Sequence, residues 1–315
     1  MRIAVMGTGG VGGYFGGLLA HAGYDVTFIA RGEHLAAIQT RGLQVQSVHG
    51  DFSVVPAAAT DAPATVGPVD YVLFATKTYH LDEALAAMRP LIGPQTAVIP
   101  LQNGIDAAER TAAALGREHV IGGVCQVGSY IAAPGVIRQI SQFRRVVVGE
   151  LDGRITPRVE AIVAALRRAG ATAEATDDIQ KALWTKFIFI APFSGVGATA
   201  RVPAGEIMAC PPTRRLLEEA MREVEAVARA RGIGLDADIV PKTMAFCDAM
   251  APEQTASMQR DIMDGKPSEL ESLIGVMVRF GDELGIPTPA FGFFYAALLP
   301  QELRSRRSRS ATTAS

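Results

Sequence analysis

Residues 1–31 constrain the fold more than any other stretch, because they form one strand–turn–helix–strand pattern. The apolar run at 2–6 is typical of a buried strand. The small and apolar residues 11–22 predict a helix, and 25–30 predict a second strand. Between the first strand and the helix the sequence spells G-x-G-x-x-G, with glycines at Gly7, Gly9 and Gly12. In this setting the pattern predicts a dinucleotide site at the start of a Rossmann-type domain.

The three glycines have separate roles in such a turn. Gly7 permits the tight turn, Gly9 lets backbone approach a pyrophosphate, and Gly12 lets the helix pack closely on the strand. Free N–H groups at the start of the helix favour phosphates. We therefore expect a dinucleotide to contact this segment, whose residues are Gly7, Thr8, Gly9, Gly10, Val11 and Gly12.

The end of the second predicted strand indicates which dinucleotide binds. NAD-selective sites usually carry Asp or Glu there, to hold the ribose hydroxyls. This chain has Arg31, followed by glycine. A guanidinium suits a 2′-phosphate, which a carboxylate would repel, so the sequence favours NADP(H). The alternative is a strand-end arginine that is merely solvated.

Length and composition favour a two-domain, soluble globular protein of the size of an enzyme. The chain has 315 residues, 49% hydrophobic and 20% charged, with a formal net charge of −2. That charge argues against nucleic-acid binding, and we find neither a run of membrane-spanning length nor a signal peptide. The cysteines, three in number and far apart, form no zinc pattern and indicate a reducing cytoplasm. We expect no metal.

Two further apolar strands are predicted at 69–75 and 96–101. The first ends in Thr76-Lys77 and the second in Gln102-Asn103-Gly104. Open parallel sheets bind ligands at the carboxyl ends of their strands, so Lys77 and Asn103 are candidate site residues. The alternatives are a surface lysine and an Asn-Gly turn.

The rest of the pattern predicts an α/β protein. A helix near 33–41 is followed by polar, alanine-rich connections. Strands near 119–127, 136–140 and 145–149 are expected to finish the sheet, as an antiparallel extension around Pro134-Gly135. After a last strand at 172–176 the period is helical, with helices predicted at 178–190, 212–231, 236–250, 268–284 and 290–298. The expected organisation is a Rossmann domain at 1–177, an all-helical domain at 178–303 and a disordered basic tail at 304–315.

Lys186 is the only charged residue in the segment 182–193, ALWTKFIFIAPF. Its neighbours one helical turn away are all apolar: Ala182, Leu183, Phe189 and Ile190. Such a lysine either lays its stem on apolar surface, with its amine in water, or presents a partly desolvated ammonium that can act as a general acid.

The segment Pro-Ser-Glu-Leu-Glu contains a second candidate. Ser268 and Glu271 fit a capping box, which gives Glu271 a structural role. Glu269 has no such role and lies beside an apolar stripe, so it needs a partner, for which Lys186 is one candidate. The alternative is a solvated acid favoured by the helix dipole. Ser257 is either a substrate-binding hydroxyl or a solvent-facing helical serine.

Together these motifs resemble the ketopantoate reductase (2-dehydropantoate 2-reductase) family over residues 1–300, nearly the whole chain. The resemblance implies a Rossmann domain followed by a helical domain like the C-terminal domain of 6-phosphogluconate dehydrogenase. It implies that NADPH reduces the ketone of a 2-oxo acid. The substrate implied is 2-dehydropantoate, which is reduced to pantoate in pantothenate and coenzyme A biosynthesis. The matching motifs are Gly7-Thr-Gly-Gly-Val-Gly12, Arg31, Thr76-Lys77, Gln102-Asn103-Gly104, Leu183-Trp184-x-Lys186, Gly205-Glu206, Ser257-Met258 and Ser268-Glu269.

The resemblance also implies residue roles. Lys186 is the proton donor, and Glu269 orients it at the cofactor–substrate junction. Lys77 and Asn103 contact the cofactor and line the site. Glu269 also contacts the cofactor, and Ser257 contacts substrate. The residues expected to contact substrate are Asn103, Lys186, Ile190, Ser194 and Ser257.

The chain departs from the family at three of its substrate-binding asparagines. These positions hold Ile190, Ser194 and Ala204. The substrate wall is therefore more apolar, so a less polar 2-oxo acid or ketone is an alternative substrate. A protein that senses NADP(H) without turnover is a second alternative, although a sensor has no need for Lys186 and Glu269. We expect a small molecule as the binding partner, and neither nucleic acid nor a membrane. The sequence does not decide whether the protein is a monomer or a homodimer.

Overall fold

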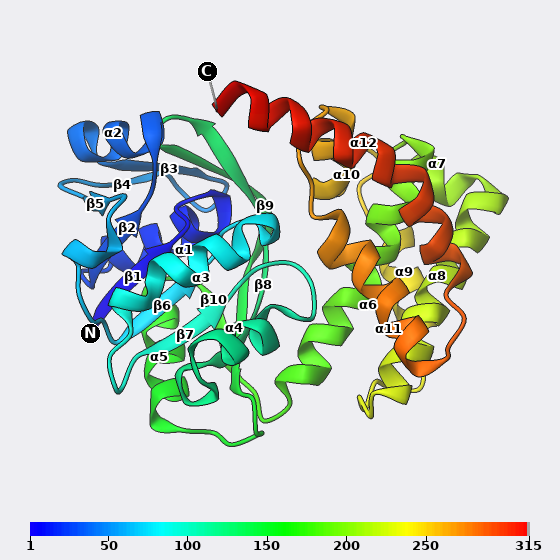
Figure 1. The fold of residues 1–315 in the computed structure, drawn as a ribbon, viewed down its shortest axis with the longest axis horizontal. Coiled ribbons are helices and arrows are strands. Elements are labelled where there is room, and N and C mark those ends of the chain that lie inside the picture. Colours follow the sequence, from blue (N-terminus) through cyan, green and yellow to red (C-terminus); the bar gives the residue numbers. More distant parts are fainter. Residues whose placement is uncertain (314–315) are drawn as a thin grey trace. The chain divides into compact units, whose positions relative to one another are not determined.

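The computed structural model describes the backbone of residues 1–313 and the side chains of residues 1–307. The chain forms two compact units (Figure 1). The first consists of Met1–Gln102 and Ala107–Ala182, and the second of Asn103–Asp106 and Leu183–Ser315. Within the described residues, every helix is too short or too polar to cross a membrane.

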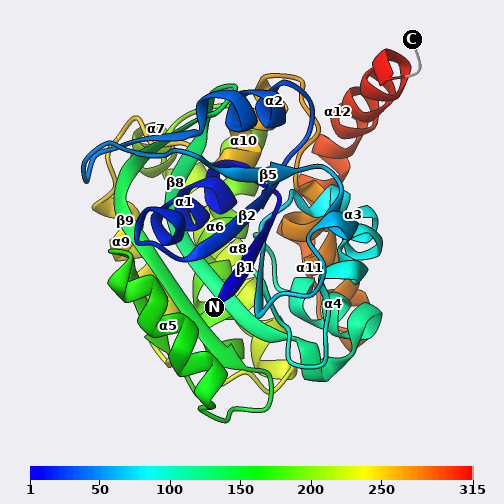
Figure 2. The same cartoon turned by 90° about the vertical axis from the view of Figure 1, so that its left-hand side faces the viewer.

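The first unit contains the predicted parallel sheet. Its five strands run in the order β5-β2-β1-β6-β7, and every pairing is parallel. Four of the five match predicted strands, and β6 and β7 are buried along their whole length. Figure 2 shows β5, β2 and β1 side by side. The strands are β1 (Arg2–Met6), β2 (Asp25–Ile29), β5 (Ala58–Thr60), β6 (Tyr71–Phe74) and β7 (Ala97–Pro100). This confirms the Rossmann-like fold.

Helices connect and cover these strands. α1 follows the glycine turn and packs tightly on β1, since a Cβ at Gly16 would lie 2.4 Å from Val5. Four short 3-10 turns lie at 63–65, 78–80, 89–91 and 117–119. The α-helices of this unit are α1 (Gly10–His21), α2 (Gly32–Arg41), α3 (Leu81–Met88), α4 (Ala107–Leu115) and α5 (Pro157–Arg168).

The later strands do not extend the first sheet, and this part of the prediction is wrong. They form a second five-stranded sheet in the order β10-β9-β3-β4, with β8 antiparallel to β9. The expected turn at Pro134-Gly135 does join β8 and β9, but β9 is one long strand where two were predicted. The start of β9 pairs in parallel with β3. The sequence did not indicate β3, because this strand is short and contains polar residues in place of an apolar run. The strands are β3 (Leu43–Ser47), β4 (Phe52–Val54), β8 (Ile121–Ala133), β9 (Val136–Glu150) and β10 (Thr172–Ala175).

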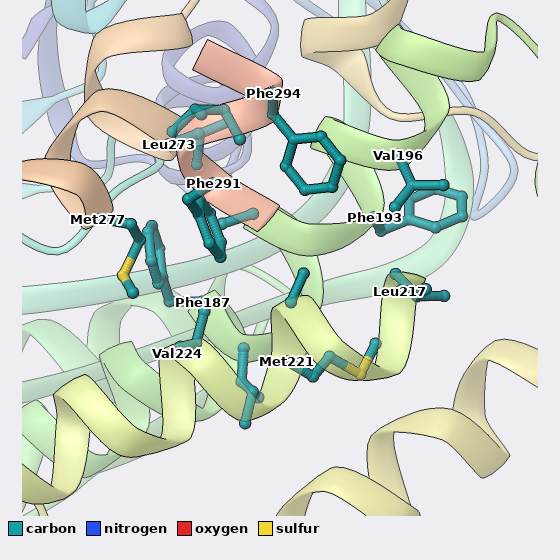
Figure 3. Close-up of a cluster of buried hydrophobic side chains, with 14 of the residues drawn as sticks. Phe187, Phe193, Val196, Leu217, Met221, Val224, Leu273, Met277, Phe291 and Phe294 are labelled. Atoms are coloured by element: carbon teal, nitrogen blue, oxygen red, sulfur yellow. The ribbon is translucent and has the colours of Figure 1, made fainter. Parts of the chain in front are cut away.

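The second unit is helical, as predicted. Its core is built from side chains of α6, α8 and α12, together with Leu273 and Met277 (Figure 3). Phe187, Met221 and Phe294 are each at most 1% exposed, and burying a side chain of this size contributes roughly 1.5–3 kcal/mol. The helices are α6 (Ile179–Ala200), α7 (Ala204–Ala209), α8 (Pro211–Ala230), α9 (Ile239–Asp248), α10 (Ser257–Met263), a π-helical turn (Glu271–Gly275), α11 (Val276–Leu284) and α12 (Pro289–Thr313).

Two helices run further than predicted. α6 does not end at 190 but continues through Pro192 to Ala200, because close packing holds it: a Cβ at Gly195 would lie 2.5 Å from Phe294. α12 continues to Thr313, whereas the sequence predicted a disordered tail from 304. Ser305 is buried, and Arg306 pairs with Glu302 one turn earlier, which favours the helix there. The last two residues of the predicted tail, 314–315, lie outside the described part of the chain.

Candidate active site

The glycine turn has the geometry of a phosphate cradle. Gly7 has φ +98°, and a Cβ there would lie 2.7 Å from the backbone nitrogen of Thr76. A Cβ at Gly12 would lie 2.2 Å from the Gly7 carbonyl oxygen, so only glycine lets α1 begin this close to β1. At Gly9, by contrast, no described heavy atom lies within 4 Å of that point. The turn is thus closed on the protein side and open at Gly9, which fits a pyrophosphate at the start of α1.

Two residues of the turn have structural roles that the sequence did not indicate. Thr8 is buried, and both its amide and its hydroxyl donate to the Ile29 carbonyl, at 3.1 and 3.0 Å. A Cβ at Gly10 would lie 2.3 Å from the Ser129 carbonyl of β8. Nearby, His34 accepts a hydrogen bond from the Gly135 amide at 3.0 Å, and burial lowers the pKa of His34 below its ordinary value. The second sheet therefore supports the turn.

Arg31 and Lys77 follow β2 and β6 at the carboxyl edge of the parallel sheet. Arg31 is the residue immediately before α2, and its side chain is 60% exposed. Its Nη1 donates to Glu83 Oε1 at 2.6 Å, and this hydrogen bond lowers the pKa of Glu83. Lys77 is half-buried and precedes the 3-10 turn at 78–80. Both cations thus stand where a parallel sheet binds ligands.

In the second unit, Asn103 joins the two predicted ionisable residues. Lys186 Nζ donates to Asn103 Oδ1 at 2.8 Å, and Asn103 Nδ2 donates to Glu269 Oε2 at 3.2 Å. Only this orientation of the amide presents oxygen to an ammonium and nitrogen to a carboxylate. Lys186 and Asn103 are half-buried, while Glu269 is 4% exposed. The sequence suggested Lys186 and Glu269 as partners, and Asn103 links them.

The backbone around Asn103 is tightly constrained. Gly104 has φ +117°, and a Cβ there would lie 3.0 Å from the Ser272 carbonyl oxygen. Ser272 belongs to the π-helical turn Glu271–Gly275, which starts two residues after Glu269. Such turns are rare and frequently mark functional sites. The Asn-Gly pair and the π-helical turn therefore fix Asn103 against the segment that carries Glu269.

A buried carboxylate holds the other side of this segment. Ser268 is fully buried, and its amide and hydroxyl both donate to Glu302, at 3.0 and 2.6 Å. Arg306 Nε donates to the same carboxylate at 2.6 Å. The predicted capping box is therefore wrong: Ser268 binds Glu302, while Glu271 accepts from the Tyr295 hydroxyl at 2.7 Å and from Arg279. Sequence reasoning missed Glu302, although it is the only acidic residue after Glu283.

The predicted substrate-contacting residues lie on two helices. Ile190 and Ser194 follow Lys186 at spacings of four and eight on α6, which places all three on one face. Ile190 is half-buried; Ser194 is 1% exposed, and its hydroxyl has no hydrogen-bond partner in the described part of the chain. Ser257 is half-buried at the start of α10, and Ala204 is buried at the start of α7.

These features define a class of protein. A Rossmann-like domain with a glycine phosphate cradle binds a dinucleotide. A lysine held by an amide and a buried carboxylate can hydrogen-bond to a carbonyl oxygen and give it a proton. The class is that of dinucleotide-binding oxidoreductases.

Comparison with known proteins narrows the class. Models of the family Ketopantoate reductase PanE/ApbA match residues 3–153, and models of its C-terminal domain match 178–302. The chain is 30% identical to the 2-dehydropantoate 2-reductase of Mesorhizobium japonicum, over 92% of this chain and 94% of that protein. It is also 30% identical to the uncharacterized oxidoreductase YkpB of Bacillus subtilis, over 95% of this chain and 98% of that protein.

A solved structure agrees with these sequence matches. The 2-dehydropantoate 2-reductase of Geobacter metallireducens superposes with a TM-score of 0.90 and 34% identity, covering 95% of this chain and 99% of that chain. The chain therefore belongs to the ketopantoate reductase family, and the predicted resemblance is confirmed.

Proposed function

We propose that this protein is an NADPH-dependent reductase of 2-oxo acids, with 2-dehydropantoate as its first candidate substrate. The observation that carries the proposal is the chain of hydrogen bonds from Lys186 through Asn103 to Glu269. Membership of the family supports it. We also propose the cytoplasm as its location, because the three cysteines are free thiols.

Lys186 performs the acid chemistry in this proposal. Attack on a ketone builds negative charge on the carbonyl oxygen, and an ammonium within hydrogen-bond reach stabilises that charge and then donates its proton. Asn103 orients Lys186 by accepting one of its three N–H bonds, which leaves two for substrate. Glu269 in turn fixes the Asn103 amide in the orientation that accepts from the lysine.

The glycine turn and Arg31 would hold the cofactor. The open space at Gly9 accommodates a pyrophosphate, and the exposed guanidinium of Arg31 suits a 2′-phosphate. Half-buried Lys77 and Asn103 are the further residues proposed to contact it. When bound, the reduced nicotinamide supplies the hydride.

A second candidate substrate class is favoured by the face of α6 beyond Lys186. Ile190 presents a hydrocarbon surface, and Ser194 presents a short hydroxyl, where the family resemblance implies amides. Ala204, the third departure, is buried and has no polar side chain. An apolar or bulkier 2-oxo acid would lose little at such a wall, whereas a hydroxylated one would lack partners for its polar groups.

The test is a substrate panel. Purified protein is assayed for NADPH oxidation with 2-dehydropantoate and with aliphatic and aromatic 2-oxo acids, beside the variants Ile190→Asn and Ser194→Asn. Turnover of 2-dehydropantoate supports the first candidate. Preference for the apolar acids, with Ile190→Asn shifting it toward 2-dehydropantoate, supports the second. Binding of NADPH without turnover of any 2-oxo acid would refute both and favour a sensor.

A further inference from the structure

An ion pair spans the end of β1 at the edge of the parallel sheet. Arg31 follows β2, and Glu83 lies in the first turn of α3, which follows β6. Arg31 Nη1 and Glu83 Oε1 are 2.6 Å apart, and Glu83 Oε2 lies 3.3 Å from His80 Nδ1. β2 and β6 are the two neighbours of β1, so the pair bridges the strand ends on either side of the glycine turn.

The position of this pair matters for the adenosine end of a dinucleotide. Neighbouring strands are about 4.8 Å apart, so the ends of β2 and β6 are about 10 Å apart and only long side chains bridge them. The group after β2 recognises the ribose 2′ substituent in Rossmann sites. Arg31 occupies that position, and Glu83 reaches it from α3. One guanidinium therefore has two competing anionic partners, the Glu83 carboxylate and a 2′-phosphate.

We propose that Glu83 is a specificity-determining residue, which narrows the preference of this protein for NADPH over NADH. Its carboxylate repels a 2′-phosphate and engages the guanidinium that would bind it. The same carboxylate can accept a hydrogen bond from a ribose 2′-hydroxyl, the task that an acidic residue after β2 performs in NAD-selective sites. This inference rests on the proposed function only in assigning Arg31 to the adenosine end of the cofactor.

The expected effect is moderate because the pair is exposed. The side chains of Arg31 and Glu83 are 60% and 54% exposed, so water and salt screen the attraction. Arg31 can therefore exchange one partner for the other. Removing the charge of Glu83 should tighten NADPH binding by about two- to fivefold at low salt, and by less at high salt.

The experiment measures the dissociation constants of NADPH and NADH by nicotinamide fluorescence, without any 2-oxo acid. The variants are Glu83→Gln, Arg31→Ala and the double variant. Asp82→Asn is the matched control, because Asp82 carries the same charge one residue away, has an 83% exposed side chain and pairs with Arg110 at 2.8 Å. This control separates the long-range electrostatic effect of a removed charge from the effect of losing the contact with Arg31.

We expect Glu83→Gln to tighten NADPH binding about two- to fivefold and to leave NADH binding unchanged or weaker. Asp82→Asn should leave the ratio of the two constants as in the wild type. Arg31→Ala should weaken NADPH more than NADH. Equal changes for both dinucleotides in Glu83→Gln, or the same change in Asp82→Asn, would overturn the proposal. If both dinucleotides bind in the expected pattern but the substrate panel shows no reduction of any 2-oxo acid, the proposed function alone is refuted. Failure to bind either dinucleotide would refute both the proposed function and this inference.

Discussion

Replacing Asn103 with alanine should disable Lys186 while leaving both ionisable side chains in place. The substitution removes the acceptor 2.8 Å from Lys186 Nζ and the donor 3.2 Å from Glu269 Oε2. A hydrogen bond to a charged group contributes about 1.5–3 kcal/mol. If one such contribution is lost in the transition state, kcat falls by roughly 10- to 150-fold. Most of the loss should appear in kcat, because the lysine still reaches the site but is no longer held.

The assay is steady-state NADPH oxidation with the best substrate of the panel, for Asn103→Ala, Glu269→Gln and the double variant. Since Glu269 acts on Lys186 through Asn103, the two losses should overlap, and the double variant should be little worse than Asn103→Ala. Unchanged kcat in Asn103→Ala, or losses that simply multiply in the double variant, would refute the reasoning.

Three further predictions concern the supports of the site and the thiols. Gly104→Ala should destabilise the protein by about 1–3 kcal/mol in denaturant unfolding, because Gly104 has φ +117° and the new Cβ would press on the Ser272 carbonyl. The control Gly292→Ala, in α12, should be neutral or stabilising, because nothing described packs within 4 Å of its new Cβ. Equal effects of the two substitutions on stability would contradict this reasoning. Glu302→Ala should lower the free energy of unfolding by about 2–3 kcal/mol, because it leaves the buried Ser268 donors without an acceptor. The control is Glu283→Ala, at an exposed residue of α11. An equal or smaller loss of stability in Glu302→Ala than in the control would count against the role of Glu302. Burial raises the pKa of Cys247 to about 12, so near pH 8 a thiol reagent should label exposed Cys210 rapidly and Cys247 only after denaturation; rapid labelling of Cys247 in the folded protein would contradict its burial.

The local pattern of the sequence predicted the parts of the fold that depend on short-range periodicity. The glycine turn, the strands β1, β2, β6 and β7 and the helical second half follow from apolar runs and helical spacing. The separate second sheet did not, although its strands β8, β9 and β10 were predicted as strands. β3 and β4 are short and partly exposed. The place of β3 depends on pairing with β9 about ninety residues later, and β4 in turn pairs with β3. Such long-range pairing leaves no periodic signal in the strand itself.

The sequence indicated the ionisable residues of the candidate site but not the residues that support them. Lys186 was conspicuous as one charge in an apolar helix, and Glu269 as an acid beside an apolar stripe. The role of Asn103 as the link depends on a chain separation of 83 residues to Lys186 and 166 to Glu269. The capping box failed because the buried Glu302 competes for the Ser268 hydroxyl, and nothing local in residues 267–271 indicates that partner.

The most direct test of the account is a single-turnover measurement on Lys186→Ala with NADPH and the best 2-oxo acid. Loss of a positioned general acid should slow reduction by roughly 10²- to 10⁴-fold, and added alkylamine should restore part of the rate. The control is Lys242→Ala, because Lys242 is a surface lysine of α9 that pairs with Asp238. This variant should react like the wild type. Reduction by Lys186→Ala at the wild-type rate would contradict the assignment of Lys186 as the proton donor.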